Sequence, residues 1–561
     1  AKIQQKEPGK FFPVPDRLPT KPNVLLITID AMVASHLGCY GYERNTSPNI
    51  DKLAESGTLF KKSYAHAPST RYSFPSIMTS RYPASVAWGK GSWPPPVVSE
   101  NFTWAEAMKE IGLYTGAILN YRFFKPEWGL NQGFDSYDNS RARLHHGRTD
   151  PATHGVSSDA MTDASIRFLD DHGSEQFFLW VHFYDPHWYY EKHEKFSIFG
   201  DGKIDLYDGE VAFTDHHIGR LLDHLATTGL DKNTIVILTG DHGEGFGEHG
   251  VWLHGYHLYN PQTSVPIIVR VPGVEPSVVD NEPIGHVDLL PTVVNLLGGT
   301  NRRAFQGHSV VDMITGEAEY PREIFQEVWF GDRGPFTRIV TLINSRWKLI
   351  YNEQPSGTFE LYDQNEDFEE EHDLWGRTDP KEEQELKEAL VRHVEEDHLP
   401  WNFHEKIGPN ISEEPFDDCP NTDLATFGAP DYVEIQGFEV EPRRVRPGET
   451  VRLTTWWKVH RALPGNWKLF VHLKPDKGKF INGDHVPVAG FYSMDKWKKG
   501  QYIRDIQEIQ IPGSQRDAEF RILTGLYHDK IRMPVEVSEP ATLSKSGTVV
   551  LGEFSVSRTR E

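Results

Sequence analysis

The chain has 561 residues, of which 25% are charged and 38% are hydrophobic, and its formal net charge at pH 7 is −23. This length exceeds what one hydrophobic core usually supports, so we expect a globular protein of two or three domains. The acidic excess argues against a general nucleic-acid-binding protein, and the two cysteines, Cys39 and Cys419, are too few for a disulfide framework.

Residues 1–20 precede the first clear structural element, and we interpret them as an N-terminal extension. The sequence begins at Ala1 rather than at a methionine, and it has no apolar run long enough to span a bilayer. Removal of a signal peptide or membrane anchor would account for this start, and so would an engineered one. The former predicts a protein of the periplasm, the extracellular space or the cell envelope, with a membrane close by.

Between residues 21 and 320, short apolar runs alternate with amphipathic stretches, which is typical of a doubly wound, mostly parallel α/β sheet flanked by helices. We interpret the apolar runs as buried parallel strands, which cover residues 23–29, 114–119, 177–184 and 234–240. Helical spacing over residues 159–170 and 211–225 provides crossover helices between strands. We expect the whole segment to fold as one α/β domain.

Polar residues follow each of these strands, and they are Asp30, Asn120, Asp185-Pro186-His187 and Asp241-His242. Because open α/β sheets bind ligands outside the carboxyl ends of their strands, we expect these side chains at one edge of one sheet. Two carboxylates and an imidazole meeting there would repel one another and lose hydration unless a cation joined them. Asp30, Asp241 and His242 are therefore candidate ligands of a divalent metal ion.

Thr70 lies just ahead of residues 74–79, a segment that could form the first turns of a helix. A hydroxyl at a helix N-terminus beside Arg71 is well placed to ionise and to bind an anionic ester, because free backbone amides, the helix dipole and the guanidinium all favour negative charge. Helix capping by Thr70 or Ser69 accounts for the local sequence equally well.

Two histidines are candidates for binding or protonating a substrate oxygen. One is His187, although an ordinary turn histidine is the better explanation of this residue taken alone. The other is His254, which follows Asp241 closely enough for its loop to fold back over the aspartate. His249 and His257 share this loop, and solvated loop positions would suit all three.

A smaller unit is expected over residues 321–400. Its antiparallel strands are predicted at residues 339–342, 347–351 and 359–362. An acidic amphipathic helix over residues 380–396 would close this unit, which we assign to the same functional part of the chain as residues 21–320.

Residues 401–430 are rich in Pro, Asn and Asp and are interpreted as a linker. From residue 431 to residue 561 the apolar residues alternate with period two, and Pro-Gly turns separate the runs. This pattern predicts a β-sandwich of immunoglobulin-like size, which would form an accessory domain.

A series of short segments runs through residues 21–375, and it comprises residues 22–30, 38–41, 46–54, 78–83, 129–135, 185–187, 240–244 and 265–270. In this order the segments resemble the alkaline phosphatase superfamily, in its sulfatase-like branch. The resemblance implies an alkaline phosphatase-like fold and a metal-dependent hydrolase or transferase of anionic esters. It also ranks His254 above the other histidines of its loop.

One departure from the family pattern concerns the nucleophile. True sulfatases carry Cys or Ser at the start of a C/S-x-P-x-R signature and oxidise it to formylglycine, whereas Thr70 occupies that position here and Phe74 replaces the arginine. Formylglycine cannot be made from threonine. A threonine nucleophile is typical of the superfamily's phosphodiesterases and of its phosphoethanolamine and phosphoglycerol transferases. Residues 247–266 are similar to those transferases, in which the histidine matching His254 lies at the metal and substrate site.

A second departure concerns the metal count. Sulfatases usually have paired aspartates after the first strand, but Ala31 follows Asp30 here. The extra Asp and His ligands of the two-zinc phosphodiesterases are not evident either. The resemblance therefore implies one cation, bound by Asp30, Asp241, His242 and the Thr70 oxygen. Mixed oxygen and imidazole ligation favours Zn²⁺ or Mn²⁺, and the family also uses Ca²⁺ and Mg²⁺.

Together these features predict a phosphoryl-ester hydrolase or transferase that acts through a covalent phospho-Thr70 intermediate on a phosphodiester, a phosphonate monoester or a phospho-alcohol substituent. Arg71 and Asn120 would hold the non-bridging oxygens, while His187 and His254 would bind substrate and protonate the leaving group. The substrate would be an anionic ester linked to a glycan or a lipid. Two alternatives remain: a sulfuric ester hydrolase without formylglycine, and a non-catalytic glycan-binding protein with a degenerate site.

Overall fold

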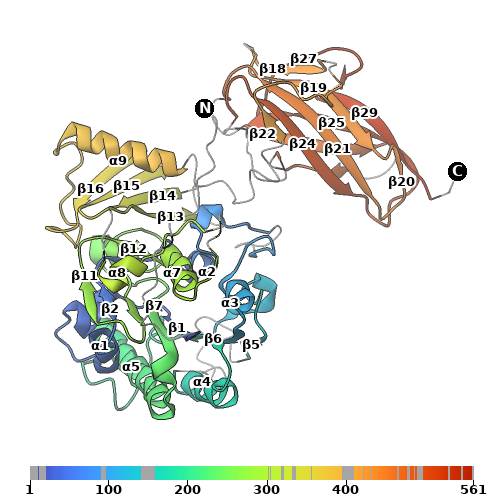
Figure 1. The fold of residues 1–561 in the computed structure, drawn as a ribbon. Coiled ribbons are helices and arrows are strands. Elements are labelled where there is room, and N and C mark those ends of the chain that lie inside the picture. The colour runs from blue at the N-terminus through green and yellow to red at the C-terminus, as the bar shows by residue number, and fades with distance from the viewer. Residues whose placement is uncertain are drawn as a thin grey trace. The chain divides into compact units, whose positions relative to one another are not determined.

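The computed structural model describes residue 11 and residues 21–558 apart from short gaps, which are residues 90–95, 141–157, 301, 303–304, 318–320, 331–336, 355–356, 395–409, 421–422, 430, 464–466, 477–479, 486, 489–493, 495–496, 529–530 and 545–546. The predicted N-terminal extension, residue 11 excepted, and residues 401–409, 421–422 and 430 of the predicted linker lie outside the described residues. The chain divides into two compact units, Ala1–Leu399 and Pro400–Glu561, and each is described by itself (Figure 1).

An eight-stranded sheet forms the centre of the first unit, in the order β11-β2-β10-β7-β1-β6-β4-β5 (Figure 1). Its strands are β1 (Asn23–Ile29), β2 (Thr58–Phe60), β4 (Tyr114–Ile118), β5 (Ser136–Asp138), β6 (Phe177–Phe183), β7 (Thr234–Gly240), β10 (Ile267–Arg270) and β11 (Ser277–Val279). All neighbouring strands are parallel except β10, which is antiparallel to both β2 and β7. The predicted mostly parallel α/β sheet is confirmed.

Helices pack on both faces of this sheet, as the doubly wound prediction requires (Figure 1). One core contains α2 (Thr70–Thr79), α3 (Trp104–Ile111), α7 (Leu289–Leu296) and α8 (Val311–Thr315). The other contains α1 (Pro48–Glu55), α4 (Ser158–His172) and α5 (Lys203–Thr228). Alternate apolar residues of β1 point into the two cores, which explains why this strand, buried on both faces, is apolar at every position except Asn23 and Thr28.

The register of the central strands brings their carboxyl ends to one edge. Ile29, the last residue of β1, pairs with Phe183 of β6 and with Gly240 of β7. The pairing continues one residue further, because Asp30 N–H donates to the Phe183 carbonyl at 2.9 Å and Asp241 N–H donates to the Ile29 carbonyl at 3.1 Å. The polar residues that follow β1 and β7 are therefore fixed side by side.

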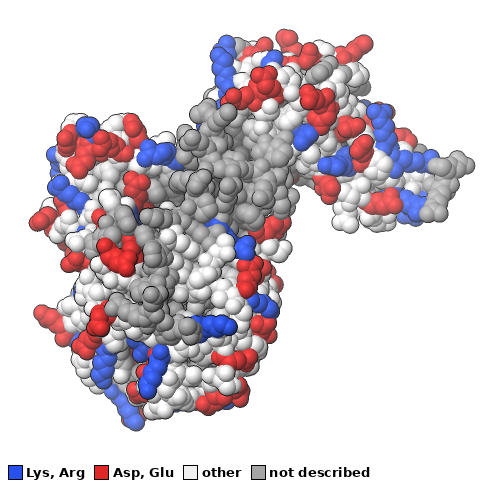
Figure 2. Space-filling model, in the orientation of Figure 1, with Lys and Arg blue, Asp and Glu red and all other residues white. Residues whose placement is uncertain are grey.

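The smaller unit predicted over residues 321–400, which lies almost entirely within the first compact unit, is a four-stranded antiparallel sheet covered by α9 (Pro380–Arg392) (Figure 1). Its strands are β13 (Ile324–Phe330), β14 (Thr337–Ile343), β15 (Trp347–Gln354) and β16 (Thr358–Asp363). The predicted strands lie within β14, β15 and β16, and the structure adds β13. Figure 2 shows the acidic side chains gathered over α9, which agrees with the predicted acidic amphipathic helix.

A buried ion pair joins this small sheet to the segment that follows the His254 loop. Lys348 Nζ on β15 lies 2.6 Å from Glu370 Oε1 and 2.8 Å from Asn260 Oδ1, and Asn260 N–H donates to Glu370 Oε2 at 2.7 Å. Asn260 begins α6 (Asn260–Thr263), and all three side chains are buried. The contact fixes the C-terminal end of the His254 loop.

Replacing Lys348 with methionine should destabilise the first unit by about 3 to 5 kcal/mol, because the Glu370 carboxylate would be left buried without a cation. Differential scanning calorimetry of the full chain measures the effect. Lys381→Met, which removes an exposed lysine of α9, is the matched control and should change stability by less than about 0.5 kcal/mol. The double change Lys348→Met with Glu370→Gln should recover much of the loss, and equal transition temperatures for all variants would contradict this view of the ion pair.

The second unit contains two sheets whose strands alternate between buried and exposed residues. One has the order β17-β24-β21-β19-β18-β27, with β17 (Ile411–Ser412), β18 (Ala425–Phe427), β19 (Val433–Glu441), β21 (Thr450–Val459), β24 (Tyr502–Gln510) and β27 (Val535–Val537). The other has the order β20-β29-β25-β22-β23, with β20 (Arg444–Val445), β22 (Lys468–Pro475), β23 (Ile481–Asn482), β25 (Ala518–His528) and β29 (Val549–Val556), and it also binds β26 (Ile531–Arg532) and β28 (Thr542–Leu543).

These two sheets pack face to face. A Cβ atom added to Gly552 of β29 would lie 2.7 Å from the ring of Phe438 on β19, so the glycine allows close approach of the sheets. The predicted C-terminal β-sandwich is confirmed, but β17 and β18 lie within residues 401–430, so part of the predicted linker belongs to this sandwich. Among the residues that the structure describes, no helix is both long enough and apolar enough to cross a membrane.

Candidate functional site

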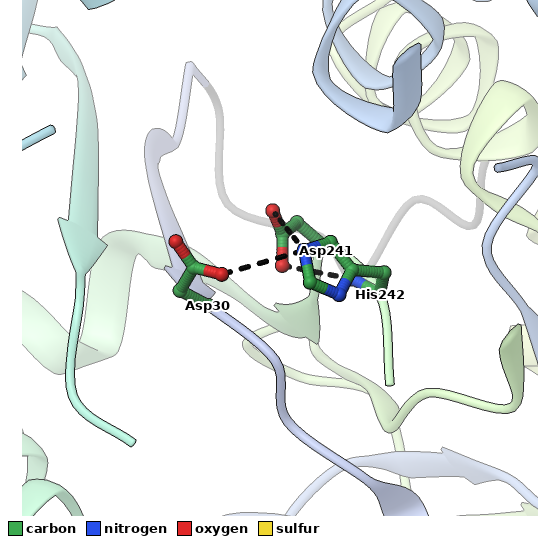
Figure 3. Close-up of side chains that lie close together, drawn as sticks. All are labelled: Asp30, Asp241 and His242. Carbon is green, nitrogen blue, oxygen red and sulfur yellow. Dashed lines mark hydrogen bonds and ion pairs between the residues drawn. The ribbon is translucent and has the colours of Figure 1, made fainter. Parts of the chain in front are cut away.

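Asp30, Asp241 and His242 meet at the carboxyl edge of the central sheet (Figure 3). All three side chains are fully buried, and one candidate ligand atom from each lies within 4.8 Å of the other two. His242 Nε2 is 3.4 Å from Asp30 Oδ1 and 3.6 Å from Asp241 Oδ2. The sequence predicted this meeting because β1 and β7 are adjacent parallel strands.

The orientation of His242 and Asp241 is set by the backbone. His242 Nδ1–H donates to the Gly243 carbonyl at 2.8 Å, so the Nε2 lone pair points at the two carboxylates. Asp241 Oδ1 accepts hydrogen bonds from the amides of Ala31 (3.2 Å) and His242 (2.8 Å), which leaves Oδ2 facing Nε2. Ala31 thus contributes an amide where most sulfatases have a second aspartate.

This donor set fits a bound cation. Burial lowers the pKa of His242 well below its usual value, so its imidazole is neutral at neutral pH. Burial, together with the charge of Asp30, raises the pKa of Asp241 well above its usual value. Neighbouring ligands of a tetrahedral ion with bonds of about 2.1 Å, or of an octahedral ion with bonds of about 2.4 Å, lie about 3.4 Å apart. The distances between the donor atoms therefore suit such an ion. Its positive charge would keep the Asp241 carboxylate ionised.

Thr70 is the first residue of α2, and its hydroxyl reaches the same cluster. Thr70 Oγ1 lies 3.1 Å from His242 Nε2, and because Nδ1 carries the proton of that ring, the hydroxyl is the donor. The helix-capping explanation does not describe this geometry: Ser69 is the N-cap residue, and its side chain makes no capping hydrogen bond. A hydroxyl at a helix N-terminus thus faces the candidate metal ligands.

His187 and His254 lie next to one another above this cluster. The ring of His254 is 4.3 Å from that of His242 and 5.0 Å from that of His187, measured between centroids. His187 is buried, with Nδ1 within 2.9 Å of the Tyr184 hydroxyl and 2.6 Å of the Trp188 carbonyl. It is therefore not an exposed turn histidine.

The loop of His254 is ordered by a short hairpin, β8 (Gly245–Phe246) paired with β9 (Trp252–Leu253). Burial would lower the pKa of His254, but the charge of Glu244 and its hydrogen bond at 3.0 Å outweigh burial and raise the pKa. His249 stacks on Tyr259 at 3.9 Å instead. His254 is thus held by Glu244 whereas His249 packs on Tyr259, and the role of His254 in binding or catalysis stays a prediction.

Arg71 and Asn120, the two predicted anion-binding residues, are placed differently. The Arg71 guanidinium lies 4.5 Å from the ring of Phe123, and Arg71 and Thr70 both line a pocket whose other walls are apolar. Asn120 is fully buried just beyond β4, which is separated from β1 by β6. It lies at the same edge of the sheet, and its role in binding stays a prediction.

Sequence reasoning missed His182 and Glu244 as parts of the site. His182 Nε2 lies 3.6 Å from Asp30 Oδ2, its Nδ1 is 3.0 Å from Thr28 Oγ1, and burial lowers its pKa to about 4. A histidine inside the otherwise apolar run of β6 was the available signal. Glu244 was visible as an acidic residue in a glycine-rich loop directly after a candidate ligand.

Phe74 fills the position of the sulfatase arginine with an aromatic ring. Its side chain is fully buried, and it packs edge-on against Phe124 at 4.6 Å and against His182 at 5.1 Å. An arginine there would need a charged partner in the middle of an aromatic cluster. This position therefore serves packing in this chain.

A mostly parallel α/β sheet whose carboxyl edge gathers two aspartates, a histidine and a threonine hydroxyl defines an alkaline phosphatase-like class of ester hydrolases. Within that class, residues 22–299 match the sulfatase family, and residues 247–397 match the C-terminal part of N-sulphoglucosamine sulphohydrolase. The part of the chain that these two matches cover, residues 22–397, belongs to the sulfatase family. The predicted sulfatase-like branch, and with it a hydrolase family, is confirmed.

Known proteins of the family show how far the similarity extends. An arylsulfatase of Hemicentrotus pulcherrimus is 26% identical over 365 residues, which cover 54% of this chain and 64% of that protein, so the match spans less than two thirds of its length. The crystal structure of Ps i-CgsB with k-i-k-neocarrahexaose has a TM-score of 0.55 at 21% identity, covering 68% of this chain and 93% of that one. The phosphonate monoester hydrolase of Agrobacterium radiobacter has a TM-score of 0.54 at 17% identity, with coverages of 67% and 96%. These structures share the fold.

Proposed function

We propose that this protein is a metal-dependent hydrolase of glycan-linked anionic esters and that it uses Thr70 as its nucleophile. Family membership supports hydrolysis of sulfuric or related esters in general. The observation that carries the finer proposal is the Thr70 hydroxyl, whose oxygen lies 3.1 Å from His242 Nε2 inside a buried cluster of two aspartates and a histidine. A threonine hydroxyl needs no oxidation before it can attack, so it favours direct displacement at phosphorus.

The site residues divide the chemistry between them. A divalent cation held by Asp30, Asp241 and His242 would neutralise charge on the ester and lower the pKa of the Thr70 hydroxyl. Thr70 Oγ1, having lost its proton to solvent, forms a bond to phosphorus while the bond to the leaving oxygen breaks, and a histidine proton passes to that oxygen. Water then attacks phosphorus, gives one proton back to the histidine and displaces Thr70, which regains a proton. An alcohol in place of water would make the reaction a transfer.

A narrow cavity of about 20 Å³ borders Thr70, and it would have to widen to hold a substituent of the substrate, which would favour a phosphorus centre over a sulfur centre. Thr70 and Arg71 border it, and its apolar walls include Trp88, Phe123, Trp128 and Leu130. In an in-line displacement the leaving alcohol departs on the side opposite the nucleophile, and the attacking water arrives from that side as well. A substituent of the substrate that is bound next to Thr70 is therefore not the leaving alcohol, and it stays bonded to the phosphorus or sulfur atom. Phosphodiesters and phosphonate monoesters carry such a group, whereas a sulfuric monoester does not.

Exposed aromatic rings around the two histidines support a glycan-linked substrate. Tyr189, Trp252 and Tyr256 are 55%, 49% and 57% exposed, and each lies two residues from His187 or His254. Lys203 Nζ lies 4.2 Å from the ring centroid of Trp252 and restrains it. Exposed aromatic faces on a soluble surface offer rigid contact area to the apolar faces of sugar rings.

Trp252→Ala should raise KM for an oligosaccharide ester by about 2- to 10-fold, the loss expected for one stacked ring. It should leave kcat/KM for a small para-nitrophenyl ester nearly unchanged, because that ester is too small to reach the Trp252 ring. Steady-state kinetics on both substrates provide the measurement. Val278→Ala, which trims a similarly exposed apolar residue on the edge strand β11, is the control. Equal effects of Trp252→Ala on both substrates would contradict a sugar-binding role.

A panel of para-nitrophenyl esters tests the proposed function. With the metal-loaded protein, the phenylphosphonate and a phosphodiester should be hydrolysed faster than the sulfate. Faster hydrolysis of the sulfate would favour a sulfatase that works without formylglycine. Absence of turnover on every ester would favour the non-catalytic glycan-binding alternative.

A further inference from the structure

Glu244 is a buried carboxylate that joins the loops carrying His187 and His254. Its side chain is fully buried, and Oε1 accepts a hydrogen bond from His254 Nδ1–H at 3.0 Å. Its other oxygen, Oε2, accepts a hydrogen bond from the Tyr190 hydroxyl at 3.2 Å. Tyr190 follows His187 in the chain, so one carboxylate binds both loops.

The β8–β9 hairpin fixes the first of these contacts. Gly245 pairs with Leu253 in the antiparallel register, so Glu244 and His254 are the next residues on either side of that pair. Neighbouring residues across an antiparallel pair lie close enough for their side chains to meet. The contact between Glu244 and His254 is thus a consequence of the hairpin register.

Tyr190 is held from its other side by Tyr207. The two rings meet edge to face at 5.5 Å, and the Tyr207 hydroxyl donates to the Ala31 carbonyl at 2.8 Å and accepts from Val33 N–H at 3.0 Å. A continuous series of contacts therefore runs from the turn after Asp30 to Glu244. The position of the carboxylate is fixed relative to the metal ligands by side chains that are themselves packed.

With Nδ1 bound to Glu244, the opposite edge of the His254 ring carries Nε2. The ring lies between His242 and His187, at 4.3 Å and 5.0 Å from their centroids, and so borders the space above Thr70. Without Glu244 the imidazole could rotate about its side-chain bonds and turn Nε2 away. Carboxylates that orient a catalytic histidine in this way are common in hydrolases.

We infer that Glu244 is a positioning residue, which directs His254 Nε2–H at the leaving oxygen, and that Tyr190 fixes Glu244 in turn. This inference rests on the proposed function. When the phosphorus–oxygen bond breaks, the electron pair stays on the leaving oxygen, which takes the Nε2 proton. The nitrogen recovers a proton from the attacking water in the second step. Glu244 accepts the Nδ1–H hydrogen bond throughout and exchanges no proton.

Glu244→Gln tests this inference because the amide keeps the shape of the side chain and removes its charge. We expect kcat for esters of alkyl alcohols to fall by about 10- to 100-fold and kcat for para-nitrophenyl esters to fall by less than about 3-fold, because a good leaving group needs little proton donation. Metal content should match that of the wild type. The control is Glu248→Gln, which removes an exposed carboxylate from the same loop. Equal losses on both ester types would overturn the inference.

Combination with His254→Ala shows whether Glu244 acts through that histidine. In the His254→Ala background Glu244→Gln should have no further effect, whereas losses that multiply would contradict the inference.

Tyr190→Phe serves if Glu244→Gln does not fold, and it should give a smaller loss with the same dependence on the leaving group. Nitrogen NMR with ¹⁵N-labelled histidine adds a readout independent of activity: the His254 Nδ1 signal should shift in Glu244→Gln and not in Glu248→Gln. An inactive wild type with the expected NMR shifts would refute the proposed function alone.

Discussion

Thr70→Ala should lose turnover on every ester by several powers of ten while binding metal almost normally. The reason is that three of the four proposed ligands remain, whereas the group that forms the covalent bond is gone. Stopped-flow or steady-state kinetics and metal analysis by mass spectrometry give the two measurements. Thr70→Ser, which keeps the hydroxyl, is the matched control and should retain most of the activity. Substantial turnover by Thr70→Ala would assign the nucleophile to another group.

Asp241→Asn should lose the metal ion and, with metal present, unfold at a lower temperature than the wild type. Loss of a ligand that binds only the folded state removes RT ln(1 + [L]/Kd) of stability, about 2.7 kcal/mol when the free metal is at 100 times its Kd. Asp223→Asn, an exposed change on α5, should bind metal normally. Normal metal content in Asp241→Asn would refute the assigned ligand set.

With the metal removed by a chelator, the wild type and Asp241→Asn should differ in how their stability depends on pH. Burial and the charge of Asp30 raise the pKa of Asp241 in the folded protein, so the metal-free wild type takes up a proton there more readily than the unfolded chain does. The contribution of Asp241 to the stability of the metal-free wild type should therefore be greatest below the ordinary carboxyl pKa of about 3.9. This contribution should be lost as the pH rises through the higher pKa of the folded state. Asp241→Asn should lack this pH dependence in thermal unfolding measured with chelator.

The metal ligands could be predicted from the sequence because strand ends carry strong signals. The apolar runs of β1 and β7 stop at Asp30 and Asp241, and parallel strands present their carboxyl ends at the same edge. The direction of β10 could not be predicted in this way, because an apolar run such as residues 265–269 has the same pattern whichever way the strand runs. Periodicity indicates burial and does not indicate strand direction.

Contacts between distant loops also lay beyond sequence reasoning. Tyr190 and Glu244 are 54 positions apart, and only the folded arrangement of their loops reveals their hydrogen bond. Phe74 illustrates a related case: the sequence shows that an arginine is missing, and the structure shows that an aromatic cluster with His182 and Phe124 takes its place. The choice between phosphorus and sulfur is harder still, because both centres present tetrahedral oxyanions to the same ligands.

The central claim is that Thr70 attacks phosphorus, and the adduct on Thr70 tests it most directly. Turnover of para-nitrophenyl phenylphosphonate is quenched with acid, and the peptide containing Ser69 to Arg71 is analysed by tandem mass spectrometry. The experiment uses the wild type and His254→Ala, because breakdown of the adduct should be slower in that variant. We predict a phenylphosphonyl group on Thr70, whose mass includes the retained phenyl ring and so cannot be confused with a sulfuryl group. An unmodified Thr70 during turnover, or a sulfuryl adduct that forms faster from the sulfate ester, would contradict the claim.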